Sequence, residues 1–106
     1  MHKDRRYVMM VSFDLPTKEK RQQSAYRKFM KYLKTNGYVM LQESIYLKLL
    51  HNSANTALEL RDIEINSPQQ GEVLVIPLSL AQFRKIRFIR GEPFDISLFS
   101  DEVLVI

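Results

Sequence analysis

The chain has 106 residues, with 16 Lys and Arg against 12 Asp and Glu and a formal net charge of +4. This length fits one domain. Cysteine is absent, which excludes disulfides, thiol nucleophiles and Cys-based zinc sites and is usual inside cells. The charged N-terminus and the short apolar run after it argue against a signal peptide or a membrane span, so we expect a cytoplasmic protein. The positive charge permits nucleic-acid binding without requiring it.

The first predicted element is a strand that begins at Tyr7 and ends in the carboxylate of Asp14. Its run of Val, Met and aromatic residues is too short for a helix, and Pro16 prevents continuation. Both sides of the run are apolar, so we expect burial on both faces. Two roles remain open for Asp14: it caps the turn, or it binds a hard cation such as Mg²⁺. A cation site would need a second carboxylate from elsewhere, because one Asp supplies too few oxygen ligands.

A helix is predicted from Lys18 to Asn36, because this segment lacks Gly and Pro, Thr17 can cap its start, and Asn36 and Gly37 can end it. At about 100° per residue, one face should pack on the sheet, and it comprises Gln22, Ala25, Tyr26, Phe29 and Leu33. The opposite face is basic, and it comprises Lys20, Arg27, Lys28, Lys31 and Lys34. No carboxylate interrupts it, although a face that only confers solubility usually mixes both signs. We predict that these five cations bind phosphates; the alternative is a solvated surface.

The segment from Tyr38 to Leu50 is strongly β-forming, and its apolar pattern changes around residues 42–44, which predicts one bent strand or two. A second helix should follow the capping residues 51–53 and run to about Asn66. Its predicted inward stripe comprises Ala54, Ala57, Leu58 and Ile65. A strand is then expected from Val73 to Leu78.

Ser79 and Gln82 form a predicted capping box for a short helical turn that runs through Phe83. A further strand is predicted from Ile86 to Ile89, and a polar loop precedes the apolar C-terminus. The order of these elements predicts a single α+β domain over residues 1–106, a ferredoxin-like sandwich of an antiparallel sheet with two helices on one face.

The C-terminal residues 102–106 include four apolar β-formers, which would promote aggregation if they formed an unpaired edge. We therefore predict that they form a strand that pairs with the partner protomer. The other face of the sheet should be apolar and uncovered, so the simplest partner is an identical chain in a homodimer.

Other chemistries find little support in the sequence. Two histidines are too few and too far apart for a His-rich metal site, and phosphate-binding Gly-rich loops and a Gly-x-Ser-x-Gly motif are absent. Phe13, Tyr26, Phe29 and Tyr46 are expected to pack in the core rather than stack on bases.

Three segments together resemble the small CRISPR-associated subunit of the spacer-acquisition (integrase) complex, an endoribonuclease-like family. These are Phe13-Asp14 at the end of the first strand, the basic helix from Lys18, and Gln42-Glu43-Ser44-Ile45-Tyr46. The resemblance covers nearly the whole chain. Residues 25–29 and 52–55 resemble the branch of type II systems.

The resemblance implies a ferredoxin-like homodimer that lies between two dimers of the larger integrase subunit and bridges double-stranded DNA. It also implies a Mg²⁺-dependent endonuclease acting on RNA or DNA, with Asp14 of each protomer beside one shared ion. We therefore expect a DNA-binding structural subunit first and a metal-dependent endonuclease second. A toxin-type ribonuclease of related fold and a small-molecule regulatory domain are the remaining alternatives.

Overall fold

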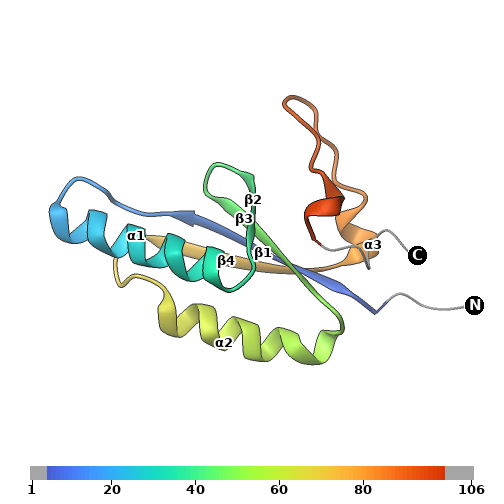
Figure 1. The fold of residues 1–106 in the computed structure, drawn as a ribbon, viewed down its shortest axis with the longest axis horizontal. Coiled ribbons are helices and arrows are strands. Elements are labelled where there is room, and N and C mark those ends of the chain that lie inside the picture. Colours follow the sequence, from blue (N-terminus) through green and yellow to red (C-terminus); the bar gives the residue numbers. More distant parts are fainter. Residues whose placement is uncertain (1–4, 100–106) are drawn as a thin grey trace, which may run out of the picture.

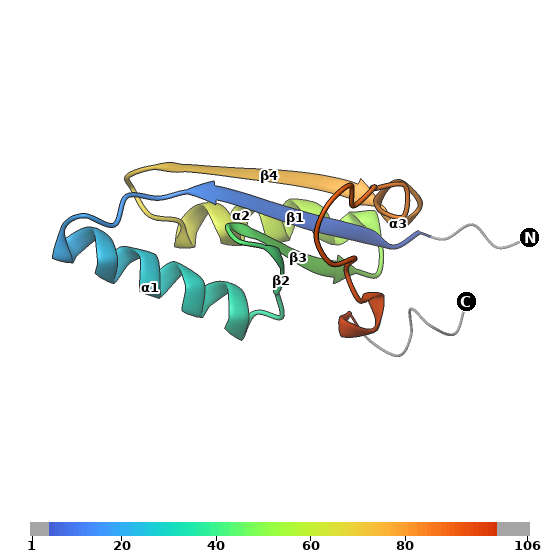
Figure 2. The same ribbon diagram turned by 90° about the horizontal axis from the view of Figure 1, so that it is seen from above.

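The computed structural model describes residues 5–99 and contains a four-stranded antiparallel sheet in the order β2-β3-β1-β4. The strands are β1 (Tyr7–Asp14), β2 (Val39–Gln42), β3 (Ile45–Leu50) and β4 (Glu72–Ser79). The α-helices are α1 (Lys20–Thr35), α2 (Thr56–Asn66) and α3 (Leu80–Phe83), and 3₁₀ turns lie at Ser53–Asn55 and Ile96–Leu98. Helices α1 and α2 cover one face of the sheet (Figures 1 and 2). The α+β ferredoxin-like fold is confirmed, and the segment from Tyr38 to Leu50 forms two strands.

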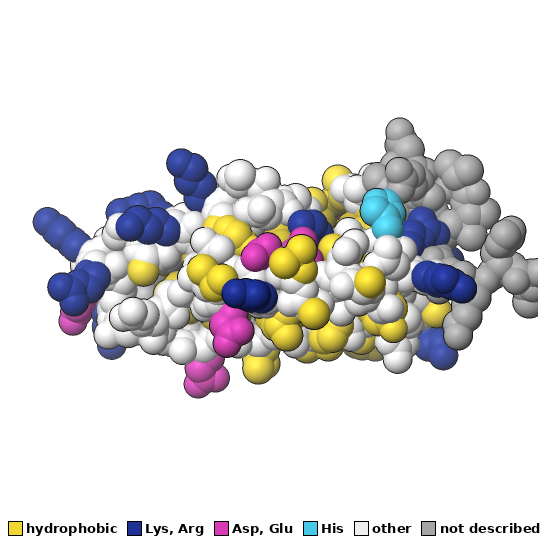
Figure 3. All heavy atoms as spheres, turned by 90° about the horizontal axis from the view of Figure 1, so that it is seen from below, with side chains coloured by type: hydrophobic (Ala, Val, Ile, Leu, Met, Phe, Trp, Pro, Cys, Tyr) yellow, Lys and Arg dark blue, Asp and Glu magenta, His cyan; other side chains and the backbone are white. Residues whose placement is uncertain are grey.

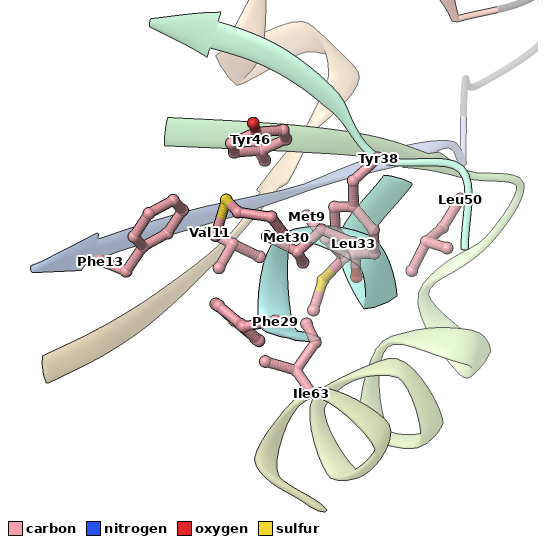
Figure 4. Close-up of a cluster of buried hydrophobic side chains, with 10 residues drawn as sticks. All are labelled: Met9, Val11, Phe13, Phe29, Met30, Leu33, Tyr38, Tyr46, Leu50 and Ile63. Atoms are coloured by element: carbon pink, nitrogen blue, oxygen red, sulfur yellow. The ribbon is translucent and has the colours of Figure 1, made fainter. Parts of the chain in front are cut away.

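The main core lies between the sheet and the two long helices (Figure 4). It contains Met9, Val11, Phe13, Phe29, Met30, Leu33, Tyr38, Tyr46, Leu50 and Ile63. Phe13 is central to its aromatic packing, because its ring centroid lies 5.7 Å from that of Phe29 and 5.8 Å from that of Tyr46. Such ring pairs add to the stabilisation from burial alone. The end of β1 is therefore held firmly in the sheet.

The second face of the sheet is only partly covered. Val8 and Leu47 of the sheet pack there against Leu80 and Phe83 of α3, in a cluster that also includes Phe94 and Phe99 of the following segment. Toward the other end of the same face, Leu74 is 61% exposed and Ile76 is 41% exposed. The chain itself therefore covers one end of the face that we expected to be open, and apolar surface remains at the end where β1 finishes.

The predicted start of the first helix is wrong by two residues. Helix α1 begins at Lys20 with Glu19 as its N-cap, not at Lys18 with Thr17. The reason is a local hydrogen bond: the side-chain oxygen of Gln22 accepts from the backbone N–H of Glu19 at 3.0 Å, which satisfies a free donor at the helix start. The predicted stop is correct, since Asn36 is the C-cap and Gly37 has a φ of +87°.

The predicted inward stripe of the second helix is also wrong. Ala54 and Ala57 are exposed, Leu58 is 61% exposed and Ile65 is 69% exposed. Only Ile63 is buried among the residues of α2. These residues do recur at helical spacing. However, the side of the helix that packs on the sheet is the one that carries Ile63.

Residues 86–89 form no strand, so that prediction is wrong. The backbone N–H of Ile86 donates to the carbonyl of Phe83 at 3.1 Å, which continues the turn after α3, and Ile89 is 91% exposed. The predicted strand at residues 102–106 lies outside the described part of the chain. The capping box before α3 is confirmed, because the Ser79 hydroxyl accepts from the N–H of Gln82 at 3.1 Å.

Candidate carboxylate site and nucleic-acid interface

Asp14 is the last residue of β1, and its side chain is exposed. Two features fix the backbone immediately before it. Phe13 is buried among aromatic rings, and its backbone N–H donates to the carbonyl of Ser44 at 3.0 Å. Ser44 belongs to the tight turn between β2 and β3 and adopts a φ of +67°. The carboxylate therefore stands at the end of a rigid strand and remains accessible to solvent.

Glu72 is the direct partner of Asp14 in the antiparallel pairing of β1 with β4. Directly paired residues share a face of the sheet, and two like charges in such a pair destabilise it. The pair lies on the partly covered face, because the next pair on that side is Ser12 with Leu74. Sequence analysis missed Glu72. It is the first residue of a strand, and only the register between β1 and β4 shows that it lies beside Asp14.

The chemistry of this pair suits a hard cation, since both residues offer carboxylate oxygens. However, residues 5–99 contain no group of three or more His, Cys, Asp or Glu side chains that could hold a metal ion. Asp14 and Glu72 would therefore bind Mg²⁺ together only if a second copy of the chain brought its own pair to the same point. Their place on the partly covered face is compatible with that arrangement.

The five cations predicted to bind phosphates are all exposed on α1: Lys20, Arg27, Lys28, Lys31 and Lys34. Helix α1 contains no Asp or Glu, and none of the five forms an ion pair within the described residues. Basic side chains lie mainly toward the two ends of the face shown in Figure 3, one of which is the end where α1 begins, and acidic and hydrophobic side chains lie between them. The residues that project outward were thus predicted correctly, and their contact with phosphate stays a prediction.

A second group of exposed cations follows α3 and comprises Arg84, Lys85, Arg87 and Arg90. They lie in irregular structure after a short helix, and Figure 1 places this segment at the end of the molecule opposite to the start of α1. A duplex bound along α1 would therefore not need this group, which provides an internal comparison for binding experiments.

The polar contacts that decide the orientation of α2 involve Glu59. The hydroxyl of Tyr38 donates to one carboxylate oxygen of Glu59 at 2.9 Å, and Lys48 pairs with the other oxygen. Burial and this hydrogen bond raise the pKa of the Tyr38 phenol well above its usual range. The ammonium of Lys48 also lies 5.6 Å from the centre of the Tyr38 ring. This group ties α2 to β3 and to the residue before β2, so we assign it a structural role.

The family model described as "CRISPR associated protein Cas2" matches residues 7–86, which include Asp14, all of α1 and Glu72. The chain belongs to this family. It is 39% identical over 98 residues to a protein of Streptococcus mutans serotype c (strain NN2025), covering 92% of this chain and 91% of that protein. It is 37% identical to a protein of Treponema denticola, with coverage of 92% and 97%. A protein of Lacticaseibacillus rhamnosus is 28% identical, with coverage of 92% and 98%.

All three relatives carry the name "CRISPR-associated endoribonuclease Cas2". The family resemblance inferred from the residues is therefore confirmed. Within residues 5–99 no helix is both long enough and apolar enough to cross a membrane.

Proposed function

We propose that this chain is a DNA-binding structural subunit of the CRISPR adaptation complex, a homodimer that bridges two dimers of a larger integrase subunit and holds protospacer duplex in the cytoplasm. The observation that carries the proposal is the basic face of α1. Its five cations are exposed, lack ion-pair partners within the described residues and share one side of a helix. A cation that is already paired with a carboxylate of the same chain would gain less binding free energy from a phosphate.

The length of α1 supports binding along a duplex. Sixteen residues at about 1.5 Å each make a helix of about 24 Å. Duplex DNA carries about one charge per 1.7 Å of its axis, so several phosphates lie within reach of one helix. Lys and Arg contacts to phosphates position a protein on DNA without reading its sequence. A scaffold that must accept any protospacer requires this kind of binding.

The proposed homodimer uses the sheet face opposite to α1. Leu74 and Ile76 are the exposed apolar residues on that face, and their burial against a second copy would remove them from water. Strand β4 is an edge of the sheet formed by residues 5–99. Pro77, which lacks an N–H, is tolerated there because the strand is an edge. A strand formed by residues 102–106 of the partner would find its pairing edge on β4.

This arrangement has a consequence for the DNA. Because α1 covers one face of the sheet and the second copy would cover the other, the two basic helices of a dimer would lie on its outside. Each would be free to contact a duplex. The test is binding of the full chain to duplexes of unrelated sequence, followed by fluorescence anisotropy. We expect equal affinities at equal salt concentration; a strong preference for one sequence, or no binding, would contradict the proposal.

A second candidate function is a Mg²⁺-dependent endonuclease, and a different observation favours it. Asp14 is accessible at a rigid strand end beside Glu72, and the relatives are named endoribonucleases. A Mg²⁺ ion bound there would polarise a phosphate and activate water. The chain would contribute the carboxylates that hold the ion.

The test of the nuclease is Asp14→Asn, which keeps the size of the side chain and removes its charge. Cleavage of RNA or DNA in Mg²⁺ should be lost, while affinity for duplex measured with a chelator present should be unchanged. If Asp14→Asn cleaves as well as the unmodified chain, the metal site must lie elsewhere.

A further inference from the structure

Gly71 makes an unusually close approach to the backbone of Asp14. It immediately precedes β4 and has a φ of +92°, a conformation that favours glycine. A Cβ built on Gly71 would lie 2.6 Å from the carbonyl oxygen of Asp14 and 2.9 Å from the ring Cδ of Pro16. Backbone and a proline ring cannot rotate away as the end of a flexible side chain can. Any side chain at this position must therefore displace the chain at Asp14 or the chain at Gly71.

Residues on both sides of Gly71 make contacts with other elements, which oppose a shift of its own segment. Before it, the side-chain oxygen of Gln70 accepts a hydrogen bond from the Gln22 amide of α1 at 3.1 Å. After it, Glu72 pairs with Asp14 in the sheet. Phe13 in turn is buried and hydrogen-bonded to Ser44. The clash would therefore displace the end of β1, where the Asp14 carboxylate is attached.

We propose that Gly71 is a positioning residue for the Asp14 carboxylate, and that its lack of a side chain sets where this carboxylate and that of Glu72 meet a bound cation. The inference rests on the proposed metal site at Asp14. Ligand groups must be held to within about 0.5 Å of their working positions. Ordinary van der Waals contact begins at 3.4 Å, so the Cβ of an alanine at 2.6 Å from the Asp14 carbonyl oxygen would require a shift of about 0.8 Å. A misplacement of about 1 Å can cost about a hundredfold in function.

The experiment compares Gly71→Ala with Gly37→Ala in the full-length chain. Gly37 provides a matched control, because its φ is +87° and its added Cβ would meet only the end of the Lys48 side chain, at 4.0 Å. Both variants place an alanine at a similar positive φ, and only Gly71→Ala brings its Cβ against the backbone of Asp14. The readouts are Mn²⁺ affinity by electron paramagnetic resonance, duplex affinity in a chelator, and amide chemical shifts of residues 13–16.

We expect Gly71→Ala to weaken Mn²⁺ binding at least tenfold and to shift the amide signals of Phe13, Asp14 and Leu15. Gly37→Ala should leave both unchanged, and both variants should keep the duplex affinity. If Gly71→Ala matches Gly37→Ala while Asp14→Asn weakens Mn²⁺ binding, the positioning inference is overturned and the metal site stands. If Asp14→Asn has no effect on Mn²⁺ binding, the metal site itself is wrong and the inference falls with it.

A second variant decides the matter if Gly71→Ala does not fold. Pro16→Ala removes the ring carbon that faces Gly71 without adding strain at a positive φ. Loosening this contact should weaken Mn²⁺ binding about threefold or more and leave duplex affinity unchanged. Unchanged Mn²⁺ affinity in Pro16→Ala would overturn the inference.

Discussion

Removal of Arg27 and Lys31 should change how salt affects DNA binding. Both side chains are exposed on the outward side of α1, so Arg27→Ala with Lys31→Ala should leave the core intact. Each cation that touches a phosphate adds about 0.9 to the slope of log affinity against log salt on duplex DNA. Five contacts give a slope of about −4.5, and three give about −2.7. Between 50 and 200 mM salt, affinity should then fall about 500-fold for the unmodified chain and about 40-fold for the variant.

The assay is fluorescence anisotropy with one labelled duplex at four or more salt concentrations. The matched control is Arg84→Ala with Arg87→Ala, which removes the same charge from exposed positions outside α1. If only the net charge mattered, the slope would change equally in both variants. Loss of direct phosphate contacts should change it only in the variant of Arg27 and Lys31. The control variant should keep the slope of the unmodified chain.

Two outcomes would refute this reasoning. If the Arg27 and Lys31 variant keeps both affinity and slope while it remains folded, the basic face of α1 is only solvated. If the control variant instead loses about 1.8 from the slope, the DNA path runs along the segment after α3.

Three further predictions concern the fold and the dimer. Ile63→Ala should lower the free energy of unfolding by about 2–5 kcal/mol and Leu58→Ala by less than about 0.5 kcal/mol, because only Ile63 is buried; chemical denaturation checks this, and the opposite order would contradict the packing of α2. Tyr38→Phe should cost about 1.5–3 kcal/mol, since the hydroxyl bonds to the Glu59 carboxylate. Burial raises the pKa of Tyr38 above its usual value of 10.0, so the contribution of this residue to stability is full below pH 10 and is lost as the pH rises above 10. Alkaline denaturation should therefore show a smaller stability loss in Tyr38→Phe. A chain cut after Ser100 should be monomeric or insoluble in sedimentation experiments, and a stable dimer would disprove strand exchange.

The sequence determined the fold class because its strongest signals were local. The apolar run ending at Asp14 could only be a buried strand, and the 16 residues of α1 carry one basic and one apolar face. Helix α2 was harder. Leu58 and Ile65 made a regular stripe, but Ile63 and the contacts of Glu59 with Tyr38 oriented the helix, and such tertiary contacts leave no periodic pattern.

The sequence alone indicated only one of the two carboxylates of the candidate site. Asp14 could be recognised from its place after a buried strand. Glu72 and Gly71 could not, because they follow Asp14 by more than 50 residues and come beside it only through the register of β1 with β4. The false strand at residues 86–89 has a related cause. Within residues 5–99 no strand pairs with this segment, and the backbone N–H of Ile86 donates instead to the turn after α3.

We propose that this protein serves spacer acquisition by holding duplex DNA through α1 rather than by cutting nucleic acid at Asp14. The most direct measurement is spacer acquisition in cells that supply the larger integrase subunit, with two variants compared side by side. We predict that Asp14→Asn acquires spacers at the normal rate and that Arg27→Ala with Lys31→Ala acquires at least tenfold fewer. Loss of acquisition in Asp14→Asn, with the basic-face variant unaffected, would contradict the account and favour the nuclease.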